Sequence, residues 1–252
     1  RAAADAAVVA ACRRRAAELY AEAVARAASD GGDVADAARG FHYADVSQRG
    51  PHRVDLRLDE ALSEAPFDAI DDARWRHLVD AALGPGALLR RRALVVAAPG
   101  AADQAFHADA PLVPEEVWRD REPGASARPP PAHSLVVFVP LCDVSAANGA
   151  TAFLPGSHAP WTAAALRAET DAPGSSSAGA PAVLSVAAGD AIVFDSRTQH
   201  AGGGNATDDV RPILYYVYAR PWFDDELHRE LVGGGDATAA AARLFPEYPP
   251  PR

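Results

Sequence analysis

The stretch GDAIVFDSRTQHAGGGNATDDVRPILYYVYARPWF, residues 189–223, contains two apolar runs typical of β-strands, with polar residues between them. A Gly-Asp turn opens the first run, and a short polar link then leads to His200. A glycine-rich turn follows, and Arg211 begins the second run, RPILYYVYA, 11 residues after His200. We therefore expect a β-rich core around this stretch, with a histidine and an arginine at the ends of its strands.

Further short apolar runs precede this stretch and are separated by turn residues such as Pro99-Gly100 and Asn148-Gly149. The runs are HRVDLRL, ALLRRRALVVAA, QAFHAD, SLVVFVPL, ATAFLP and AVLSVA. Many short strands at this spacing favour a sandwich or a barrel. The chain is predicted to be mainly β.

Helices are expected to flank this core. Residues 1–39 have apolar side chains at helical spacing, and one helix is predicted over 67–84, with Phe67, Ile70, Leu78 and Ala81 or Ala82 on one face and Gly84 as its stop. The tail from Asp224 is predicted to be helical. The segments 121–132 and 171–181 are rich in Pro, Gly, Ser and Ala and are predicted to be surface loops. We predict a single domain over 1–252, with an N-terminal helical segment 1–50, a core 51–223 and a helical tail 224–252.

Composition excludes some classes of partner. The chain has 252 residues, 49% of them apolar, and a net charge of −10, which argues against nucleic acid because phosphate binding needs basic surface. No run of about 18 apolar residues predicts a membrane span. Cys12 and Cys142 have no metal-site spacing and are expected to be buried or half-buried thiols. They suit a reducing compartment, and we expect a cytoplasmic location.

The stretch QAFHADAP, 104–111, places His107 and Asp109 two residues apart. If AFHAD is a strand, both side chains leave the same face of the sheet. An imidazole and a carboxylate form two thirds of the facial triad, two histidines and one carboxylate, that binds non-haem Fe(II). An HxD pair also arises by chance, so the prediction needs a second histidine, and His200 is the candidate.

Three ordered blocks together resemble one family. They are the HxD pair, the hairpin NGATAFLPGSH at 148–158, and the stretch 189–223. This combination resembles the phytanoyl-CoA dioxygenase (PhyH-like) family of Fe(II)- and 2-oxoglutarate-dependent oxygenases, over roughly residues 54–223. The resemblance implies a double-stranded β-helix, a cupin-like jelly roll, as the core.

The resemblance also implies roles for individual residues. His107, Asp109 and His200 would bind iron, and Arg211 would pair with the distal carboxylate of 2-oxoglutarate, which a guanidinium can hold through two hydrogen bonds. A structural Arg211 paired with an internal Asp or Glu is the alternative. Gln104 would contact the cosubstrate or support the ligands, although a solvent-facing Gln104 is an equal alternative.

One position departs from the family pattern. Many members carry Ser or Thr two residues after the arginine, where this chain has Ile213. By strand parity Tyr215 is the next residue on the Arg211 face, so its phenol is a candidate contact to the cosubstrate.

The implied activity is hydroxylation of a small molecule with release of succinate and CO2. Fe(II), 2-oxoglutarate and O2 are the implied cofactors, with ascorbate as a reductant. Halogenating relatives replace the carboxylate by a small residue, so Asp109 favours hydroxylation. The segments 110–132 and 159–181 are candidates for a substrate lid.

Two other functions remain open from the residues alone. One is a non-redox jelly-roll protein that binds a metal or a ligand, which the Ile213 departure favours. The other is a zinc hydrolase, because zinc also accepts two histidines and a carboxylate.

The triplets 13–15 and 90–92 are predicted to be solvated arginines, with Arg90 or Arg92 as a minor candidate for contact with an anionic substrate.

Overall fold

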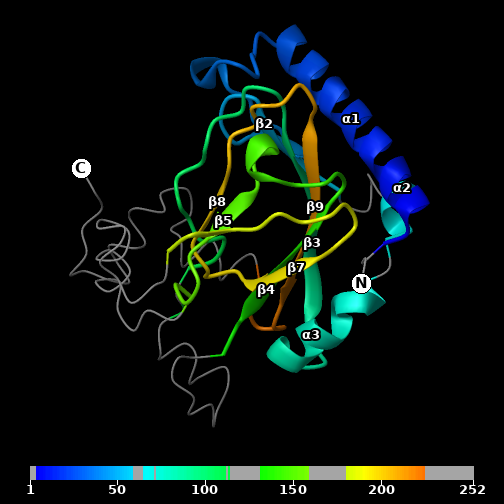
Figure 1. The fold of residues 1–252 in the computed structure, drawn as a ribbon, viewed down its shortest axis with the longest axis vertical. Coiled ribbons are helices and arrows are strands. Elements are labelled where there is room, and N and C mark those ends of the chain that lie inside the picture. The colour runs from blue at the N-terminus through cyan, green and yellow to red at the C-terminus, as the bar shows by residue number, and fades with distance from the viewer. Residues whose placement is uncertain are drawn as a thin grey trace, which may run out of the picture.

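Figure 1 shows the computed structural model, which describes residues 4–58, 65–70, 72–111, 113, 131–158 and 180–224. Its helices and strands are α1 (Ala6–Ser29), η1 (Ala37–Arg39), β1 (Val46–Gln48), β2 (Arg53–Arg57), α2 (Ala65–Asp68), α3 (Ala73–Leu83), β3 (Leu88–Ala97), β4 (Ser134–Pro140), η3 (Ala146–Asn148), β5 (Thr151–Phe153), β6 (Ala182–Val183), β7 (Ile192–Asp195), β8 (His200–Gly202) and β9 (Arg211–Ala219). None of the helices within these ranges combines the length and apolar character needed to cross a bilayer.

Two antiparallel sheets form the core. The main sheet has six strands in the order β1-β2-β3-β9-β4-β7, and the smaller sheet has three in the order β6-β5-β8. Aromatic side chains from both sheets meet between them, because Phe153 of β5 packs with Phe138 of β4 and Phe194 of β7. This is the arrangement of the jelly roll that the sequence predicts.

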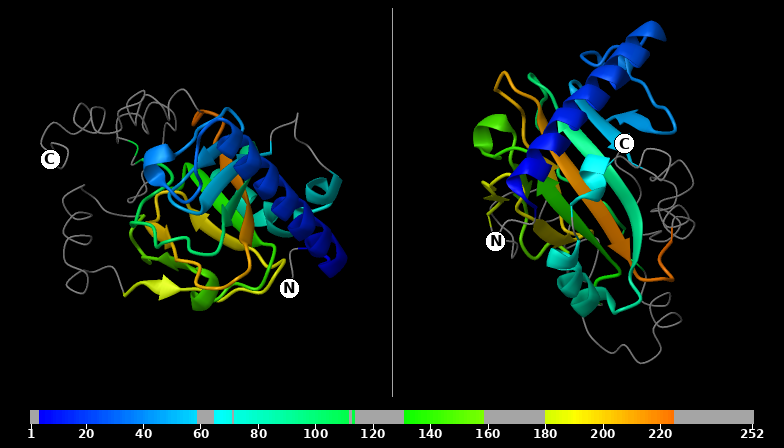
Figure 2. Two further views of the ribbon diagram at one scale, coloured as in Figure 1. Left: turned by 90° about the horizontal axis from the view of Figure 1, so that it is seen from above. Right: turned by 90° about the vertical axis from the view of Figure 1, so that its right-hand side faces the viewer.

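Helix α1 covers the outer face of the main sheet (Figure 2). The Asp5 carboxylate caps its first turn by accepting a hydrogen bond from the Ala7 amide at 2.8 Å. Its buried residues recur every three or four positions and pack on the sheet: Val9, Cys12, Ala16, Leu19, Ala23 and Ala27. This period places one apolar stripe of the helix against the strands.

Strand β9 shows how the two faces of the main sheet differ. Leu214, Tyr216 and Tyr218 belong to the apolar core beneath α1, whereas Ile213 and Tyr215 lie on the inner face. The period of two along a strand produces this division. The inner face therefore looks toward the smaller sheet.

The single helix predicted over 67–84 is wrong, because two short helices, α2 and α3, replace it. Helix α3 buries Trp75, Val79 and Leu83, while Leu78, predicted to be on the buried face, is 47% exposed. The Asp72 carboxylate accepts a hydrogen bond from Tyr218 Oη at 3.0 Å at the start of α3. Packing of Trp75 against β9 thus decides which face is buried.

Gly84, at φ 88°, ends the helix as predicted.

The strand predicted for QAFHAD is also wrong. Within it only His107 forms an antiparallel bridge, to His200, and the polar link leading to His200 ends in the short strand β8. Both cysteines are buried free thiols, as predicted, and burial raises the pKa of Cys12 to about 11.

The predicted helical tail from Asp224 and nearly all of the predicted loops at 121–132 and 171–181 lie outside the described residues.

Candidate active site

A cavity of about 790 Å³ lies between the inner face of the main sheet and the segment 102–110. Its walls include the HxD pair and His200. Cavities of this size commonly hold small ligands and cofactors. All of the site residues predicted from the sequence line this one space: Gln104, His107, Asp109, His200, Arg211 and Tyr215.

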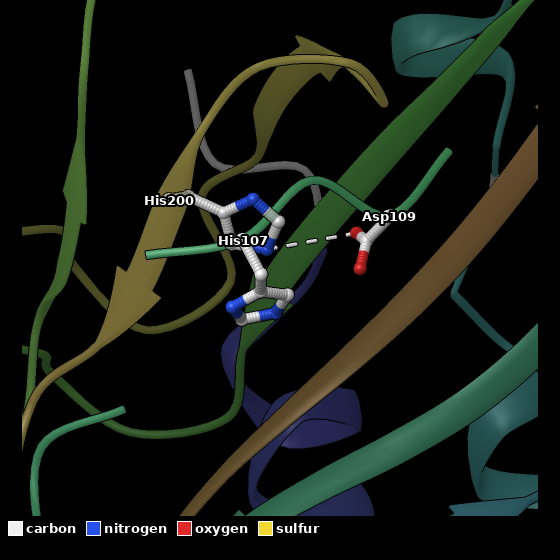
Figure 3. Close-up of side chains that lie close together, drawn as sticks. All are labelled: His107, Asp109 and His200. Atoms are coloured by element: carbon white, nitrogen blue, oxygen red, sulfur yellow. Dashed lines mark ion pairs between the residues drawn. The ribbon is translucent and has the colours of Figure 1, made fainter. Parts of the chain in front are cut away.

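His107, Asp109 and His200 point toward one another in this cavity (Figure 3). Each offers one ligand atom, and these atoms all lie within 4.8 Å of one another. The Nε2 atom of His200 lies 3.6 Å from Oδ2 of Asp109. His200 is 4% exposed, whereas Asp109 is exposed.

Backbone pairing, not a shared strand, brings the three side chains together. The His107 amide donates to the His200 carbonyl at 3.0 Å, and the His200 amide donates back at 2.9 Å. Two residues later the Asp109 amide donates to the carbonyl of Ser196 at 2.9 Å. The two histidines are therefore directly opposite each other, and Asp109 is held beside them by the segment that precedes β8.

Each imidazole is oriented by its own backbone. Nδ1 of His107 lies 3.0 Å from the Ala105 carbonyl, and Nδ1 of His200 lies 3.0 Å from the Thr198 carbonyl. A carbonyl oxygen only accepts, so Nδ1 carries the proton and donates in both rings. The lone pair is then on Nε2, as in many metal-binding histidines. Burial lowers the pKa of His200 by more than the Asp109 charge and the hydrogen bond to the Thr198 carbonyl raise it, and the neighbouring His107 adds a small lowering, so the neutral ligand form is favoured.

The third sequence block supports β8 from the other side. The Ser157 hydroxyl of the Pro-Gly-Ser-His turn accepts a hydrogen bond from the Gln199 amide at 2.8 Å. The Leu154 amide donates to the Gln199 carbonyl at 2.9 Å. The turn thus fixes the residue immediately before His200, while His158 itself is not among the cavity-lining residues.

The glycines after His200 allow segments to approach closely. A Cβ atom on Gly202 would lie 2.5 Å from Oε1 of Gln104, and one on Gly203 would lie 2.8 Å from the Ala150 carbonyl oxygen. Gln104 uses this space, because its Oε1 accepts a hydrogen bond from the Gly202 amide at 3.2 Å. Gln104 therefore ties the segment before His107 to β8, and it is not turned out to solvent.

Arg211 is buried at one end of the cavity without a carboxylate partner among the described residues. It is 1% exposed, its Nε donates to the Asn148 carbonyl at 3.3 Å, and its Nη2 has no hydrogen-bond partner there. Burial, with a smaller contribution from nearby Arg53, lowers its pKa to about 10. An unpaired buried guanidinium is costly unless an anion completes the site. The alternative of an internal Asp or Glu partner finds no support in the described residues.

Arg53 is a second buried arginine that the sequence reasoning missed. It is 2% exposed, and its Nη2 donates to the carbonyls of Ala102 at 3.0 Å and Gly203 at 2.9 Å. Ala97 of β3 pairs with both Arg53 and Arg211, so the two arginines belong to one layer of the inner face. The strict alternation of HRVDLRL was the available signal, because the face that carries Arg53 and Asp55 is the inner one.

Tyr215 lies on the Arg211 face, as strand parity predicts, and its hydroxyl contacts Asp55. Its Oη lies 3.1 Å from both carboxylate oxygens of Asp55 and donates to them. Burial and then the Asp55 charge raise the pKa of Tyr215, so the phenol stays neutral. Ile213 lies on the same wall.

Of the remaining predicted candidates, Arg90 lines the cavity, and Arg92 instead pairs with Asp68 outside it. The proposed lid segments 110–132 and 159–181 fall largely outside the described residues.

Comparison with known proteins agrees with these features. The family model described as phytanoyl-CoA dioxygenase (PhyH) matches residues 1–213. The protein named dioxygenase af480 of Aspergillus fumigatus is 31% identical over 163 residues, 60% of this chain and 46% of that protein. The iron/alpha-ketoglutarate-dependent dioxygenase ausU of Aspergillus calidoustus is 29% identical over 168 residues, 63% of this chain and 47% of that protein. The chain thus spans about half the length of these curated relatives.

Solved structures show the same fold. EctD from S. alaskensis with bound Fe has a TM-score of 0.54 at 19% identity, and the match covers 86% of this chain and 70% of that chain. The epimerase SnoN in complex with Fe3+, alpha ketoglutarate and nogalamycin RO has a TM-score of 0.53 at 20% identity, and the match covers 87% and 77%. The predicted jelly-roll fold is confirmed. Because the family model covers most of the chain, this protein belongs to the phytanoyl-CoA dioxygenase family.

Proposed function

We propose that this protein is an Fe(II)- and 2-oxoglutarate-dependent dioxygenase that hydroxylates a small molecule and releases succinate and CO2. One observation carries the proposal. Two imidazoles with free Nε2 atoms and a carboxylate converge in the same cavity as a buried arginine that has no carboxylate partner among the described residues.

The donor set fits Fe(II). His107, Asp109 and His200 would hold the metal on one face and leave other coordination positions open. When bound, the iron supplies O2 activation, coupled to the oxidative decarboxylation of 2-oxoglutarate. The chain's own contribution is to turn both imidazoles so that Nε2 looks into the cluster. The family resemblance implies that halogenating relatives carry a small residue in place of Asp109, so hydroxylation is the expected outcome.

The cationic end of the cavity fits a dicarboxylate. Arg211 would grip the distal carboxylate of 2-oxoglutarate through its free Nη2, and Arg53 adds a second positive charge in the same layer. Ile213 gives no hydroxyl to this contact, and the hydroxyl of Tyr215 is already engaged by Asp55. We therefore assign cosubstrate binding to Arg211, with Gln104 holding the adjacent segment and Tyr215 forming the wall.

The test is 2-oxoglutarate binding and consumption by the reconstituted protein. Under anaerobic conditions, Fe(II)-loaded wild type should bind one 2-oxoglutarate per chain by calorimetry, and Arg211→Gln should bind it at least about 100-fold more weakly. Admission of air should then yield succinate. A protein that holds metal but neither binds nor consumes 2-oxoglutarate would be a metal binder or a hydrolase, and the proposal would be wrong.

A further inference from the structure

The wall of the cavity formed by β3 carries two consecutive arginines, Arg90 and Arg91. Adjacent residues of a regular strand point to opposite faces, so only one of them should reach the cavity. The pairing of β3 with β9 shifts register between Leu89 and Arg91, which marks a β-bulge. A bulge re-aims side chains in this way. Both arginines consequently line the same space.

Arg92 provides the contrast on the same strand. It pairs with Tyr216, a residue of the outer core, and its guanidinium forms an ion pair with Asp68. It takes no part in the cavity wall. The triplet predicted to be a solvated face is therefore divided between two environments.

Neither cavity arginine pairs with a carboxylate among the described residues. Arg90 donates through Nη2 to the Pro221 carbonyl at 2.8 Å, and its Nε is buried without a partner there. Arg91 forms no ion pair within the described ranges, and its charge acts on Tyr215 of the neighbouring strand β9. Of the other carboxylates that line the cavity, Asp55 pairs with Arg49, Asp103 accepts from the Gly204 amide and Asp109 belongs to the metal-binding cluster, which leaves Asp224 against the two arginines. Guanidinium groups in this setting fit an oxyanion.

This cationic wall is separate from the cosubstrate end. Val217, the partner of Arg91 in the sheet, is six residues after Arg211 along β9, or roughly 20 Å at the rise of a strand. The metal-binding side chains lie between these ends, because His200 packs against Phe138, which pairs with Tyr215. One ligand could contact Arg91 while another occupies the Arg211 end.

The part of the cavity beside Arg91 carries apolar side chains. Val217, Ala219 and Phe223 line it, and strands β3 and β4 flank β9, so about 10 Å separates their backbones. An extended apolar body of a few carbons spans this distance.

We propose that the substrate of this site has an apolar body that ends in an oxyanion, a carboxylate or a phosphate, and that Arg91 binds the oxyanion with support from Arg90. The inference rests on the proposed function, since it assigns the substrate class of the same cavity. Arg91 is a specificity-determining residue, and the anion fixes which carbon of the apolar body lies beside the metal.

The experiment compares octanoate with octanamide, which match in length and differ in charge. Binding to Mn(II)- and 2-oxoglutarate-loaded protein is measured by calorimetry, and proton relaxation by Mn(II) reports whether the bound chain lies near the metal. Wild type should bind octanoate more tightly than octanamide. Arg91→Gln should weaken octanoate binding about tenfold to a hundredfold and leave octanamide binding unchanged.

Two further variants control for folding and charge. Arg92→Gln, which removes an equal charge from the outer face, should bind octanoate like wild type, and Arg91→Lys should retain most of the binding. The proposal is overturned if octanoate binds no better than octanamide, if neither binds at millimolar concentration, or if Arg91→Gln and Arg92→Gln behave alike. Loss of 2-oxoglutarate binding in the wild type would instead count against the proposed function.

Discussion

The two faces of the main sheet differ in what they bury. The outer face, beneath α1, is apolar and continuous, with Leu94, Val96 and Leu214 fully buried. The inner face of the same sheet buries Arg53 and Arg211, which both pair with Ala97, the residue next to Val96. Apolar burial stabilises the fold, whereas unpaired buried charge opposes it. The comparison teaches that the inner face is organised for ligands at a cost to the stability of the ligand-free protein.

The largest expected effect is on the metal-binding side chains. Asp109→Ala should abolish succinate formation, with a loss of at least about 1,000-fold, or about 4 kcal/mol. Because Asp109 is exposed, the free energy of unfolding of the metal-free protein should change by less than about 0.5 kcal/mol. A succinate assay and denaturant titration of the metal-free protein measure the two quantities. A large loss of stability would mean that Asp109 stabilises the fold, and it would contradict the proposed difference between the inner and outer faces of the sheet.

The second effect concerns the outer face. Leu94→Ala removes a fully buried side chain from the core beneath α1, so the free energy of unfolding should fall by about 3 kcal/mol. At a temperature where the variant is folded, 2-oxoglutarate affinity should remain within about twofold of wild type. Denaturant titration and calorimetry provide the measurements. Comparable losses in the free energies of unfolding and of 2-oxoglutarate binding would show that the outer face also contributes to ligand binding.

The third effect is on Arg211, where the stability of the ligand-free protein and the affinity for 2-oxoglutarate should change in different directions. Arg211→Met replaces an unpaired buried charge by an apolar chain of similar length, which should leave the ligand-free protein as stable as wild type or more stable. The affinity for 2-oxoglutarate should fall at least about 100-fold, or about 2.7 kcal/mol. If the variant is instead markedly less stable without ligand, Arg211 holds the fold together through an anionic partner.

The smallest effect is on the pH dependence of stability. Burial lowers the pKa of His200, so in the metal-free protein the unfolded chain binds the proton at higher pH than the folded chain does. The contribution of His200 to the free energy of unfolding is therefore fully present above the ordinary histidine pKa. It is lost as the pH falls through the lowered pKa of His200 in the folded state. His200→Asn should therefore lose less stability than wild type between about pH 7 and pH 5, by less than about 1 kcal/mol. Denaturation curves of both proteins at the two pH values measure these losses. Equal losses in His200→Asn and wild type would contradict the lowered pKa of His200.

Sequence reasoning found the fold and brought the main site residues to one cavity. Short apolar runs separated by turn residues favoured a sandwich or a barrel. The family resemblance, carried by the HxD pair, the hairpin at 148–158 and the stretch 189–223, implied the jelly roll and placed His200 and Arg211 at one site with the HxD pair. Strand parity also placed Tyr215 correctly on the Arg211 face. These signals are local or depend on order along the chain, so a single sequence contains them.

The misses came from contacts between distant segments. The segment 104–109 resembles a strand by composition, yet its hydrogen bonds go to β8 at one position only, and Ser196 fixes the rest. HRVDLRL was predicted only as a strand, and Arg53 was not singled out, because alternation does not reveal which face meets a second sheet. The bulge that turns both Arg90 and Arg91 into the cavity depends on the register with β9, which the sequence alone does not show.

An anaerobic crystal structure with Fe(II) and 2-oxoglutarate tests the central claim most directly. We predict one ion coordinated by Nε2 of His107, Nε2 of His200 and the Asp109 carboxylate, with Nη2 of Arg211 donating to the distal carboxylate of the bound oxoacid. A metal bound elsewhere, or a 2-oxoglutarate that leaves Arg211 unpaired, would contradict the account.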